Sequence, residues 1–575
     1  MKQQIGTIVY GSLTDGFLMR IASHVPVDTI KTGKFVSIAG NHGTFFSLIT
    51  DLKLEVAHPD ILLFPPTAQE TLLNEIMRER ALYATAVLRP LLMLNEYRQK
   101  MPVKTVPPHF APVYDVDAAD VALIFGDPHD RSQRYFNVGT PLDMQTPVCL
   151  DLEALAERSN GIFGKTGTGK TFLTRLVLAG LIKNNKAVNL VFDMHSEYGL
   201  QARKEGSGKA FVKGLKTLFP DKVALFSLDP ASTRRRGSSP DVTLTLAYQS
   251  VQVQDIISLQ EELNLHATAC EAAYLIAAKF KQNWLQELLS HGDEIKEFAA
   301  LVGAHPESVA ALYRKLKQIE RLPFFVRTTS VSYLDTISSH KDAQKSLDMD
   351  GVNPPTSSEI ASKASNFVSR SEAGRNDPIN QMIDYLDRGT SVIIEFGNHT
   401  STFCYLLLAN IITRRIHELY TEKTEKFLGS HRKEDEPKKL MITVEEAHKF
   451  LNPQAARQTI FGTIAREMRK YYVSLLIVDQ RPSGIDDEVL SQIGTKIVAQ
   501  LNDEKDIAAA LTGVPNAVQL RNVLASLDSK KQVLLLGHAV AMPVVIETRS
   551  YDEAFYAAME GVVHKNVDEL VREMF

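Results

Sequence analysis

The stretch that decides the fold is Gly164-Lys165-Thr166-Gly167-Thr168-Gly169-Lys170-Thr171. It fits the phosphate-binding pattern G-x-x-x-x-G-K-[ST] at every fixed position and precedes an apolar helix expected over Phe172 to Lys183. The glycines let the backbone wrap closely around a polyphosphate and direct N–H groups at it, where a Cβ would block the approach. Lys170 is placed to neutralise the β and γ phosphates, Thr171 offers its hydroxyl to Mg²⁺, and the helix start favours the same anion. The stretch predicts a site for a nucleoside triphosphate with Mg²⁺.

Length, charge and cysteine content limit the class of protein. At 575 residues the chain is long enough for three or four domains of about 150 residues each. The 64 Lys and Arg residues against 68 Asp and Glu give a net charge of −4, so any DNA contact is expected to be local, in a loop or channel. The three cysteines are widely separated, which argues against a zinc site or a disulfide framework and fits a reducing cytoplasm. We expect a soluble cytoplasmic protein without a membrane partner, since no apolar run is long enough to cross a bilayer and the N-terminus lacks a signal-peptide core.

The first 145 residues predict a small β-barrel. Short β segments divided by glycine turns are expected at Ile5 to Tyr10, Lys34 to Ala39 and Phe45 to Val56. The pattern becomes helical between Pro65 and Gln99, and a strand is expected again at Val121 to Phe125.

From residue 146 the rhythm changes to apolar strands alternating with longer helices. The expected strands are 187–192, 391–396, 440–444, 473–478, 496–499 and 532–536. This alternation is typical of an α/β fold with a parallel sheet between helices.

The chain therefore divides into five predicted units, with the α/β domain in two parts at 146–250 and 378–550. Apolar residues at helical spacing predict a helical insertion at 251–377, and the last segment, 551–575, is expected to form a helical arm. Ser232 to Asp241, which contains three consecutive arginines, and Thr421 to Lys439 are expected to be flexible surface loops.

Two adjacent carboxylates follow the strand expected at 440–444. Glu445 and Glu446 form the arrangement needed where one acid holds the Mg²⁺ shell and the next activates water. The backbone turns at the end of a strand, so both side chains can reach the nucleotide from different sides. We predict Glu445 with Thr171 in the metal shell and Glu446 as the catalytic base; the alternative is two solvated glutamates that open the next helix.

Polar side chains also follow two other strands. Gln480, after strand 473–478, can hydrogen-bond the attacking water or the γ phosphate and is the predicted phosphate sensor. Asp193, after strand 187–192, is predicted to lie near the active centre behind the residues that touch the nucleotide. For His195 and Glu197, turn formation or supporting hydrogen bonds are favoured over a metal site.

Hydrolysis also needs positive charge on the phosphoryl oxygens, and an arginine from the same or an adjoining subunit supplies it best. Arg466 and Arg469 lie on the helix expected before strand 473–478, on one face at i, i+3. Arg158 precedes the phosphate strand and is a candidate for its own or a neighbouring subunit's nucleotide. The alternative for each is an ordinary surface charge.

Five blocks of sequence, in the expected order, together resemble the HerA branch of the HerA/FtsK ATPases. They are Arg158-Ser159-Asn160-Gly161-Ile162-Phe163, Asp193-Met194-His195-Ser196-Glu197-Tyr198-Gly199, Glu445-Glu446-Ala447-His448-Lys449-Phe450, Arg466-Glu467-Met468-Arg469-Lys470-Tyr471 and Gln480-Arg481-Pro482-Ser483. The N-terminal segment, with Ile5-Gly6 and Gly33-Lys34-Phe35-Val36, looks like the small HAS-type barrel of this family. The chain departs from the family pattern at Ser196, where Gly is frequent, at Glu445, where Asp is usual, and at Asn160-Gly161, where bulkier residues are usual.

The resemblance implies a RecA-like P-loop ATPase domain in a hexameric ring that threads double-stranded DNA and moves it by hydrolysing ATP between subunits. A NurA-like nuclease or a defence effector would dock on the barrel side. By matching position, Arg158 would be the same-subunit arginine, and Arg469 or Arg466 would be the finger offered to the next subunit.

Two functional hypotheses follow. The first is an ATP-driven double-stranded DNA translocase or helicase. The second is an ATP-gated hexameric scaffold that assembles and regulates an effector in antiphage defence. The sequence shows no nuclease cluster and no G-x-S-x-G or Cys/His nucleophile arrangement, so any cleavage would belong to another polypeptide. A small-molecule kinase is disfavoured by the paired acids and by the size of the N-terminal barrel.

Overall fold

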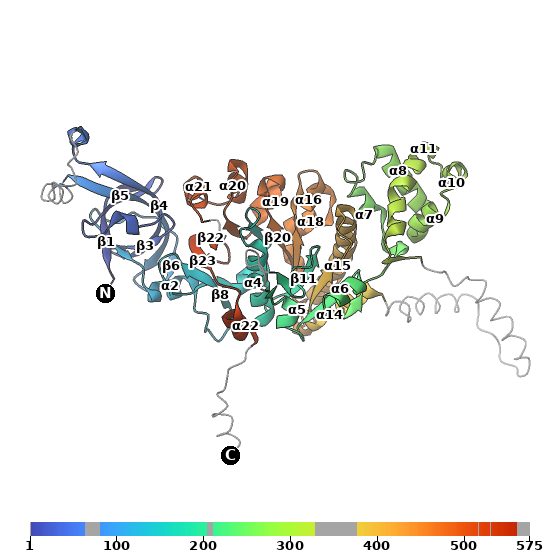
Figure 1. Ribbon diagram of the computed structural model, residues 1–575, viewed down its shortest axis with the longest axis horizontal. Coiled ribbons are helices and arrows are strands. Elements are labelled where there is room, and N and C mark those ends of the chain that lie inside the picture. The colour runs from blue at the N-terminus through green and yellow to red at the C-terminus, as the bar shows by residue number, and fades with distance from the viewer. Residues whose placement is uncertain are drawn as a thin grey trace, which may run out of the picture.

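A barrel, a central sheet and a group of helices follow one another along the long axis of the molecule (Figure 1). The structure is a computed structural model, and it describes residues 2–63, 77, 81–203, 211–327, 377–515, 517–528 and 531–560. No helix in these ranges is both long and apolar enough to span a bilayer.

The N-terminal barrel closes through six strands, which confirms the barrel prediction. The strands are β1 (Gln4–Ser12), β2 (Gly16–Ile21), β3 (Phe35–Gly40), β4 (Gly43–Val56), β5 (Leu82–Asn95) and β7 (Pro112–Asp115). They pair in the order β2-β1-β7-β3-β4-β5, and pairing of β2 with β5 closes the ring, while β6 (Lys100–Met101) extends beyond β5. Apolar side chains such as Phe17, Ile38 and Phe45 fill the inside.

Two local predictions in this region are wrong. The helical pattern predicted between residues 65 and 99 gives strand β5 over 82–95, because its apolar residues pair along nearly the whole of β4; residues 64–76 and 78–80 lie outside the described ranges. The strand predicted at 121–125 is helix α2 (Ala118–Phe125), because Asp117 and Asp120 form a reciprocal capping box at its start. A short apolar run does not distinguish a buried helix from a buried strand.

The central sheet contains twelve strands in the order β15-β14-β18-β11-β19-β20-β10-β21-β22-β23-β8-β9. Their bounds are β8 (Tyr135–Pro141), β9 (Val148–Asp151), β10 (Asn160–Phe163), β11 (Val188–Asp193), β14 (Val223–Ser227), β15 (Val242–Thr243), β18 (Ser391–Glu395), β19 (Leu440–Glu445), β20 (Val473–Asp479), β21 (Thr495–Ala499), β22 (Gln532–Gly537) and β23 (Val544–Thr548). The six strands predicted for the α/β domain are all present. The sheet is mixed, because β22, β23, β8 and β9 add in antiparallel fashion to an otherwise parallel sheet.

Helices connect the parallel strands and add to the sheet ends. They are α3 (Leu152–Glu157), α4 (Lys170–Lys183), α5 (Leu215–Leu218), α6 (Pro230–Arg235), α14 (Pro378–Arg388), α15 (Thr402–Ser430), α16 (His448–Leu451), α17 (Ala455–Gln458), α18 (Ile460–Glu467), α19 (Asp487–Gln492), α20 (Glu504–Ala510), α21 (Ala517–Ala525) and α22 (Glu553–Glu560). The α/β class and the P-loop arrangement of strand, loop and helix predicted from the sequence are confirmed.

The strand order places the phosphate loop where the topology reverses. β10 lies between β20 and β21, and the chain then passes through α4 to β11, on the far side of β20 and β19. Ligands bind at such a switch point, beyond the carboxyl ends of the strands. The ends of β10, β11, β19 and β20 therefore meet at one edge of the sheet.

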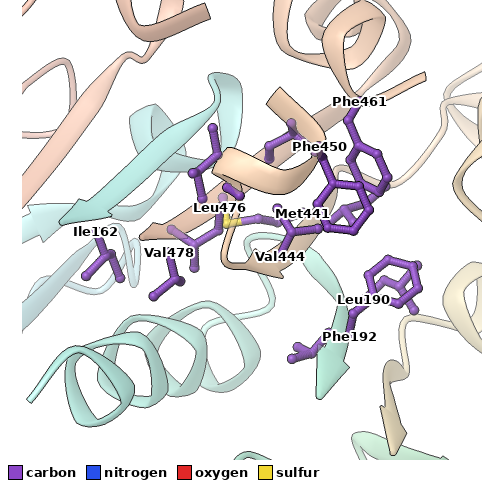
Figure 2. Close-up of a cluster of buried hydrophobic side chains, with 14 of the residues drawn as sticks. Ile162, Leu190, Phe192, Met441, Val444, Phe450, Phe461, Leu476 and Val478 are labelled. Atoms are coloured by element: carbon purple, nitrogen blue, oxygen red, sulfur yellow. The ribbon is translucent and has the colours of Figure 1, made fainter. Parts of the chain in front are cut away.

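Apolar side chains from these same strands hold the edge in place. Figure 2 shows Ile162 of β10 near Val478 of β20, and Leu190 and Phe192 on β11. Phe450 of α16 packs against Phe461 of α18 with ring centroids 4.5 Å apart. This buried aromatic contact fixes the segment that follows β19, a few residues after Glu445 and Glu446.

The insertion is helical, as predicted, where it is described. It contains α7 (Val253–Ile257), α8 (Ala267–Phe280), α9 (Trp284–Ser290), α10 (Ile295–Val302) and α11 (Pro306–Leu316). Residues 328–376 of the predicted insertion and 561–575 of the predicted C-terminal arm lie outside the described ranges.

The division into five units remains a prediction. Strand β8 precedes the predicted boundary at residue 145 but pairs with β23 in the large sheet.

Both predicted surface loops contain ordered structure instead. α15 continues through residue 430, because Tyr420 and Thr424 remain buried on one of its faces. α6 covers residues 230–235 and is capped by Asp229. Arg236, the last of the three consecutive arginines, donates to the fully buried carboxylate of Glu395 at 2.5 Å, so the start of this segment is tied to the sheet.

Candidate active site

The phosphate loop connects β10 to α4. Gly167 and Gly169 have φ angles of 80° and 86°, a region that residues with a Cβ rarely adopt. The Thr168 hydroxyl donates to the Lys165 carbonyl at 2.8 Å, and the Lys170 ammonium donates to the same carbonyl at 3.0 Å. A Cβ on Gly164 would come within 2.8 Å of Thr168 Oγ1. The loop is therefore already curved, as a polyphosphate cradle requires.

A cavity of about 240 Å³ opens at this loop, lined by residues from four separate parts of the chain. The lining residues are Thr166, Gly167, Gly169, Lys170, Thr171, Phe172, Arg175, His195, Glu197, Glu445, Glu446 and Gln480. The structure thus brings five of the eight predicted loop residues, both predicted acids and the predicted sensor to one cavity. Its oxygen donors, a threonine hydroxyl and carboxylates, are the kind that Mg²⁺ prefers.

Gln480 joins the phosphate loop to the predicted base. Its amide nitrogen donates to Glu446 Oε1 at 3.1 Å, and its amide oxygen accepts from the Thr166 hydroxyl at 2.5 Å. Glu446 has a φ of 49°, an uncommon conformation for a non-glycine residue. This turn directs Glu446 into the cavity after Glu445 has ended the strand.

Glu445 is held in a buried environment. Its Oε1 accepts from the Tyr198 hydroxyl at 2.6 Å, and Oε2 has no hydrogen-bond partner within the part of the chain described. Burial is the main cause that raises the pKa of this carboxyl to about 8; the nearby Asp193, Glu197 and Glu446 act in the same direction, and the Tyr198 hydrogen bond acts against them.

Asp193 shapes the loop after β11. Its fully buried carboxylate accepts the backbone N–H groups of Glu197, Tyr198 and Gly199 at 2.7, 2.8 and 3.2 Å. Burial and the nearby Glu395 together raise its pKa to about 6, against the three backbone hydrogen bonds, which lower it. Ser196 in this loop has a φ of 57°, which explains why glycine suits the position.

The hydroxyl of Thr171 faces Glu197 rather than Glu445. Thr171 Oγ1 donates to Glu197 Oε2 at 2.9 Å. The guanidinium of Arg175, one turn further along α4, donates to the carbonyl of the same Glu197. Sequence reasoning missed Arg175 and gave Glu197 only a supporting place. The signal that was available is the spacing of Arg175 four residues after Thr171, which puts both on one face of the helix.

The three candidate arginines lie away from this cavity. Arg158 caps the C-terminal end of α3 and packs beside Gly494, at the amino end of β10. The four residues of β10 separate it from the loop by roughly 13 Å at about 3.3 Å per residue. This placement argues against the predicted same-subunit role and leaves the neighbouring-subunit role as a prediction.

Arg466 and Arg469 occupy the same far edge of the sheet. Arg466, half-buried at the end of α18, donates to the Ala456 carbonyl at 3.0 Å. Arg469 is exposed on the 3₁₀ turn Met468–Tyr471 that precedes β20. Seven residues of β20, roughly 20 Å, lie between that turn and Gln480. Arg469 is therefore exposed at the edge of the sheet opposite the phosphate loop.

A contact between half-buried His448 and buried Asp479 supports the segment that follows Glu446. His448 Nδ1 lies 3.0 Å from Oδ2 of the fully buried Asp479, which also accepts the His448 backbone N–H at 2.7 Å. This contact with Asp479 raises the pKa of His448 above its usual 6.5.

The raised pKa of His448 predicts a pH-dependent contribution to stability. Because the folded-state pKa lies above the unfolded value, the contribution is complete below about pH 6.5 and is lost as pH rises through the folded pKa. We expect the difference in unfolding free energy between wild type and His448→Gln to shrink from pH 6 to pH 9, measured by urea denaturation. A difference that grows with pH would contradict the pair.

Comparison with known proteins places the chain. Residues 136–416 match the sequence family described as helicase HerA, central domain. A protein named DNA double-strand break repair helicase HerA from Sulfolobus acidocaldarius is 29% identical over 251 residues, which cover 36% of this chain and half the length of that relative. A protein of the same name from Pyrococcus furiosus is 23% identical over 433 residues, covering 71% of this chain and 68% of the relative.

Two solved structures show a more distant likeness. VirB4 of Thermoanaerobacter pseudethanolicus aligns with a TM-score of 0.37 and 13% identity, covering 73% of this chain and 98% of that one. The bacterial conjugative coupling protein TrwB aligns with a TM-score of 0.36 and 12% identity, covering 76% and 92%. From the family match and the curated relatives, residues 136–416 form a P-loop ATPase domain of the HerA/FtsK type.

Proposed function

We propose that this protein hydrolyses ATP with Mg²⁺ and uses the energy to move double-stranded DNA. The observation that carries the proposal is the cavity in which a curved phosphate loop, three carboxylates and an amide meet. A P-loop protein that only bound nucleotide would not need Gln480 hydrogen-bonded both to Glu446 and to Thr166 of the loop.

Each residue has a proposed task. Lys170 and the loop N–H groups neutralise the β and γ phosphates. Mg²⁺, when bound, supplies positive charge to the same phosphates, and Thr171 and a carboxylate hold it. Glu446 accepts the proton of the attacking water. Gln480, bonded to both Thr166 and Glu446, registers whether the γ phosphate is present.

The assembly is proposed to be a hexameric ring in the cytoplasm with DNA in its channel. Arg469 is proposed as the finger supplied to the next subunit's ATP, because it is exposed at the edge of the sheet opposite its own phosphate loop. Arg158 and Arg466 are secondary candidates for that role. Nuclease activity would come from a separate protein on the barrel, a NurA-like nuclease or a defence effector.

The experiment is ATP hydrolysis with and without duplex DNA, together with displacement of a third strand from a triplex. We expect duplex DNA to raise turnover several-fold and ATP to drive displacement. The affinity for DNA should fall steeply as the salt concentration rises from about 50 to about 200 mM, because contacts to the DNA phosphates release bound counterions. ATP hydrolysis without displacement would favour the alternative, an ATP-gated scaffold that regulates an effector in antiphage defence. Absence of ATP hydrolysis under all conditions would overturn both.

A further inference from the structure

We propose that Glu197, and not Glu445, is the carboxylate that faces Mg²⁺ together with Thr171, and that Arg175 positions it. The inference rests on the proposed nucleotide site and assigns the protein side of its metal shell. It departs from the sequence pattern, in which the acid at the end of β19 takes that place.

The spacing of the two oxygens carries the first step. Thr171 Oγ1 and Glu197 Oε2 are 2.9 Å apart. Mg²⁺ takes octahedral oxygen ligands at about 2.0–2.1 Å, so two ligands on adjacent vertices stand about 2.9 Å apart. The pair is thus already at the separation that a shared ion requires, and both residues line the cavity at the phosphate loop.

Glu445 is held by other contacts through its Oε1 and its backbone, while its Oε2 has no partner among the described residues. Its Oε1 accepts from the Tyr198 hydroxyl at 2.6 Å, and its backbone N–H donates to the Tyr405 hydroxyl at 3.2 Å, while that hydroxyl donates to the Glu445 carbonyl at 3.1 Å. Tyr198 and Tyr405 are both fully buried, so these contacts fix Glu445 from two sides. Glutamate is one methylene longer than the aspartate usual at this position of the family pattern, and this length lets the Glu445 carboxylate reach the Tyr198 hydroxyl.

Glu197 is also held by two contacts, but both are made by its backbone, so its carboxylate remains available to Thr171. Asp193 accepts its backbone N–H at 2.7 Å, and Arg175 donates to its carbonyl. Arg175 is 1% exposed, and its guanidinium lies over the rings of Phe172 and Tyr551, 5.4 and 6.0 Å from their centroids. A buried arginine packed against two rings has little freedom, so the loop it holds is fixed relative to α4.

The test measures metal binding rather than turnover. The full chain is loaded with ATPγS, and the affinity of the complex for Mn²⁺, a substitute for Mg²⁺, is measured by electron paramagnetic resonance. Glu197→Gln is expected to weaken Mn²⁺ binding about 10- to 100-fold, and Glu445→Gln less than about threefold. ATPγS affinity in EDTA should remain near wild type in both variants.

Controls separate the possible outcomes. Glu297→Gln, an exposed glutamate of α10 outside the cavity, should leave Mn²⁺ affinity near wild type. Arg175→Lys keeps the charge but loses the planar fork, and should weaken Mn²⁺ binding in the same direction as Glu197→Gln. If Glu445→Gln weakens Mn²⁺ binding and Glu197→Gln does not, the assignment of Glu197 to the metal is overturned. A wild-type Mn²⁺ affinity in Arg175→Lys would remove the positioning role. Failure of the wild-type chain to bind ATPγS would instead overturn the proposed function on which the assignment rests.

Discussion

Glu446→Gln is expected to lower ATP turnover about 10²- to 10⁴-fold, the usual contribution of a positioned general base. Nucleotide binding should remain near wild type, because the phosphate loop and Lys170 are untouched. The glutamine carbonyl can still accept from Gln480, so the contact now made by Glu446 Oε1 at 3.1 Å can persist. The variant therefore removes proton acceptance without removing the surrounding geometry.

The measurement is phosphate release at saturating ATP, with ATPγS affinity determined on the same preparation. Glu297→Gln on α10, an exposed glutamate far along the chain in the helical insertion, is the matched control and should turn over like wild type. Robust turnover by Glu446→Gln would exclude Glu446 as the base. Loss of ATPγS binding would instead indicate that its role is in holding the nucleotide.

Arg469→Ala is expected to lower turnover about 10³- to 10⁵-fold if it is the finger supplied to a neighbouring site, the range measured for such arginines. Its effect should come from another subunit, because roughly 20 Å of strand β20 separates it from its own phosphate loop. Nucleotide affinity should change much less than turnover, since the charge acts mainly as the transition state develops.

Mixing two inactive variants tests the shared site directly. A ring that contains both Arg469→Ala and Glu446→Gln subunits has interfaces with an intact base on one side and an intact arginine on the other. Such mixtures should regain part of the wild-type turnover, whereas either variant alone should not. Lys470→Ala, at the exposed neighbouring position, is the control. If mixing does not restore ATP turnover, Arg469 is not a finger between subunits. The same conclusion follows if the chain stays monomeric in the presence of ATP and duplex DNA.

Local patterns predicted much of the fold and part of the site. The phosphate loop, the strands that end before Asp193, Glu445 and Gln480, and the barrel at the N-terminus all follow from residue types at fixed spacing. The errors fall where the pattern is ambiguous. Residues 82–95 and 121–125 are apolar runs whose secondary structure depends on pairing with β4 or on a cap, and the charged stretch at 421–430 continues helix α15.

The sequence by itself determined that a triphosphate cradle stands at the end of a buried strand, because glycine conformations and the Lys-Thr pair depend on only eight neighbouring residues. Only the tertiary structure decided which carboxylate meets Thr171, since the Tyr198 hydroxyl that holds Glu445 lies 247 positions away in the chain. It also decided that Arg158 and Arg469 lie at the far edge of the sheet from the phosphate loop. Such choices depend on strand order and on buried hydrogen bonds between distant segments, which no local spacing encodes.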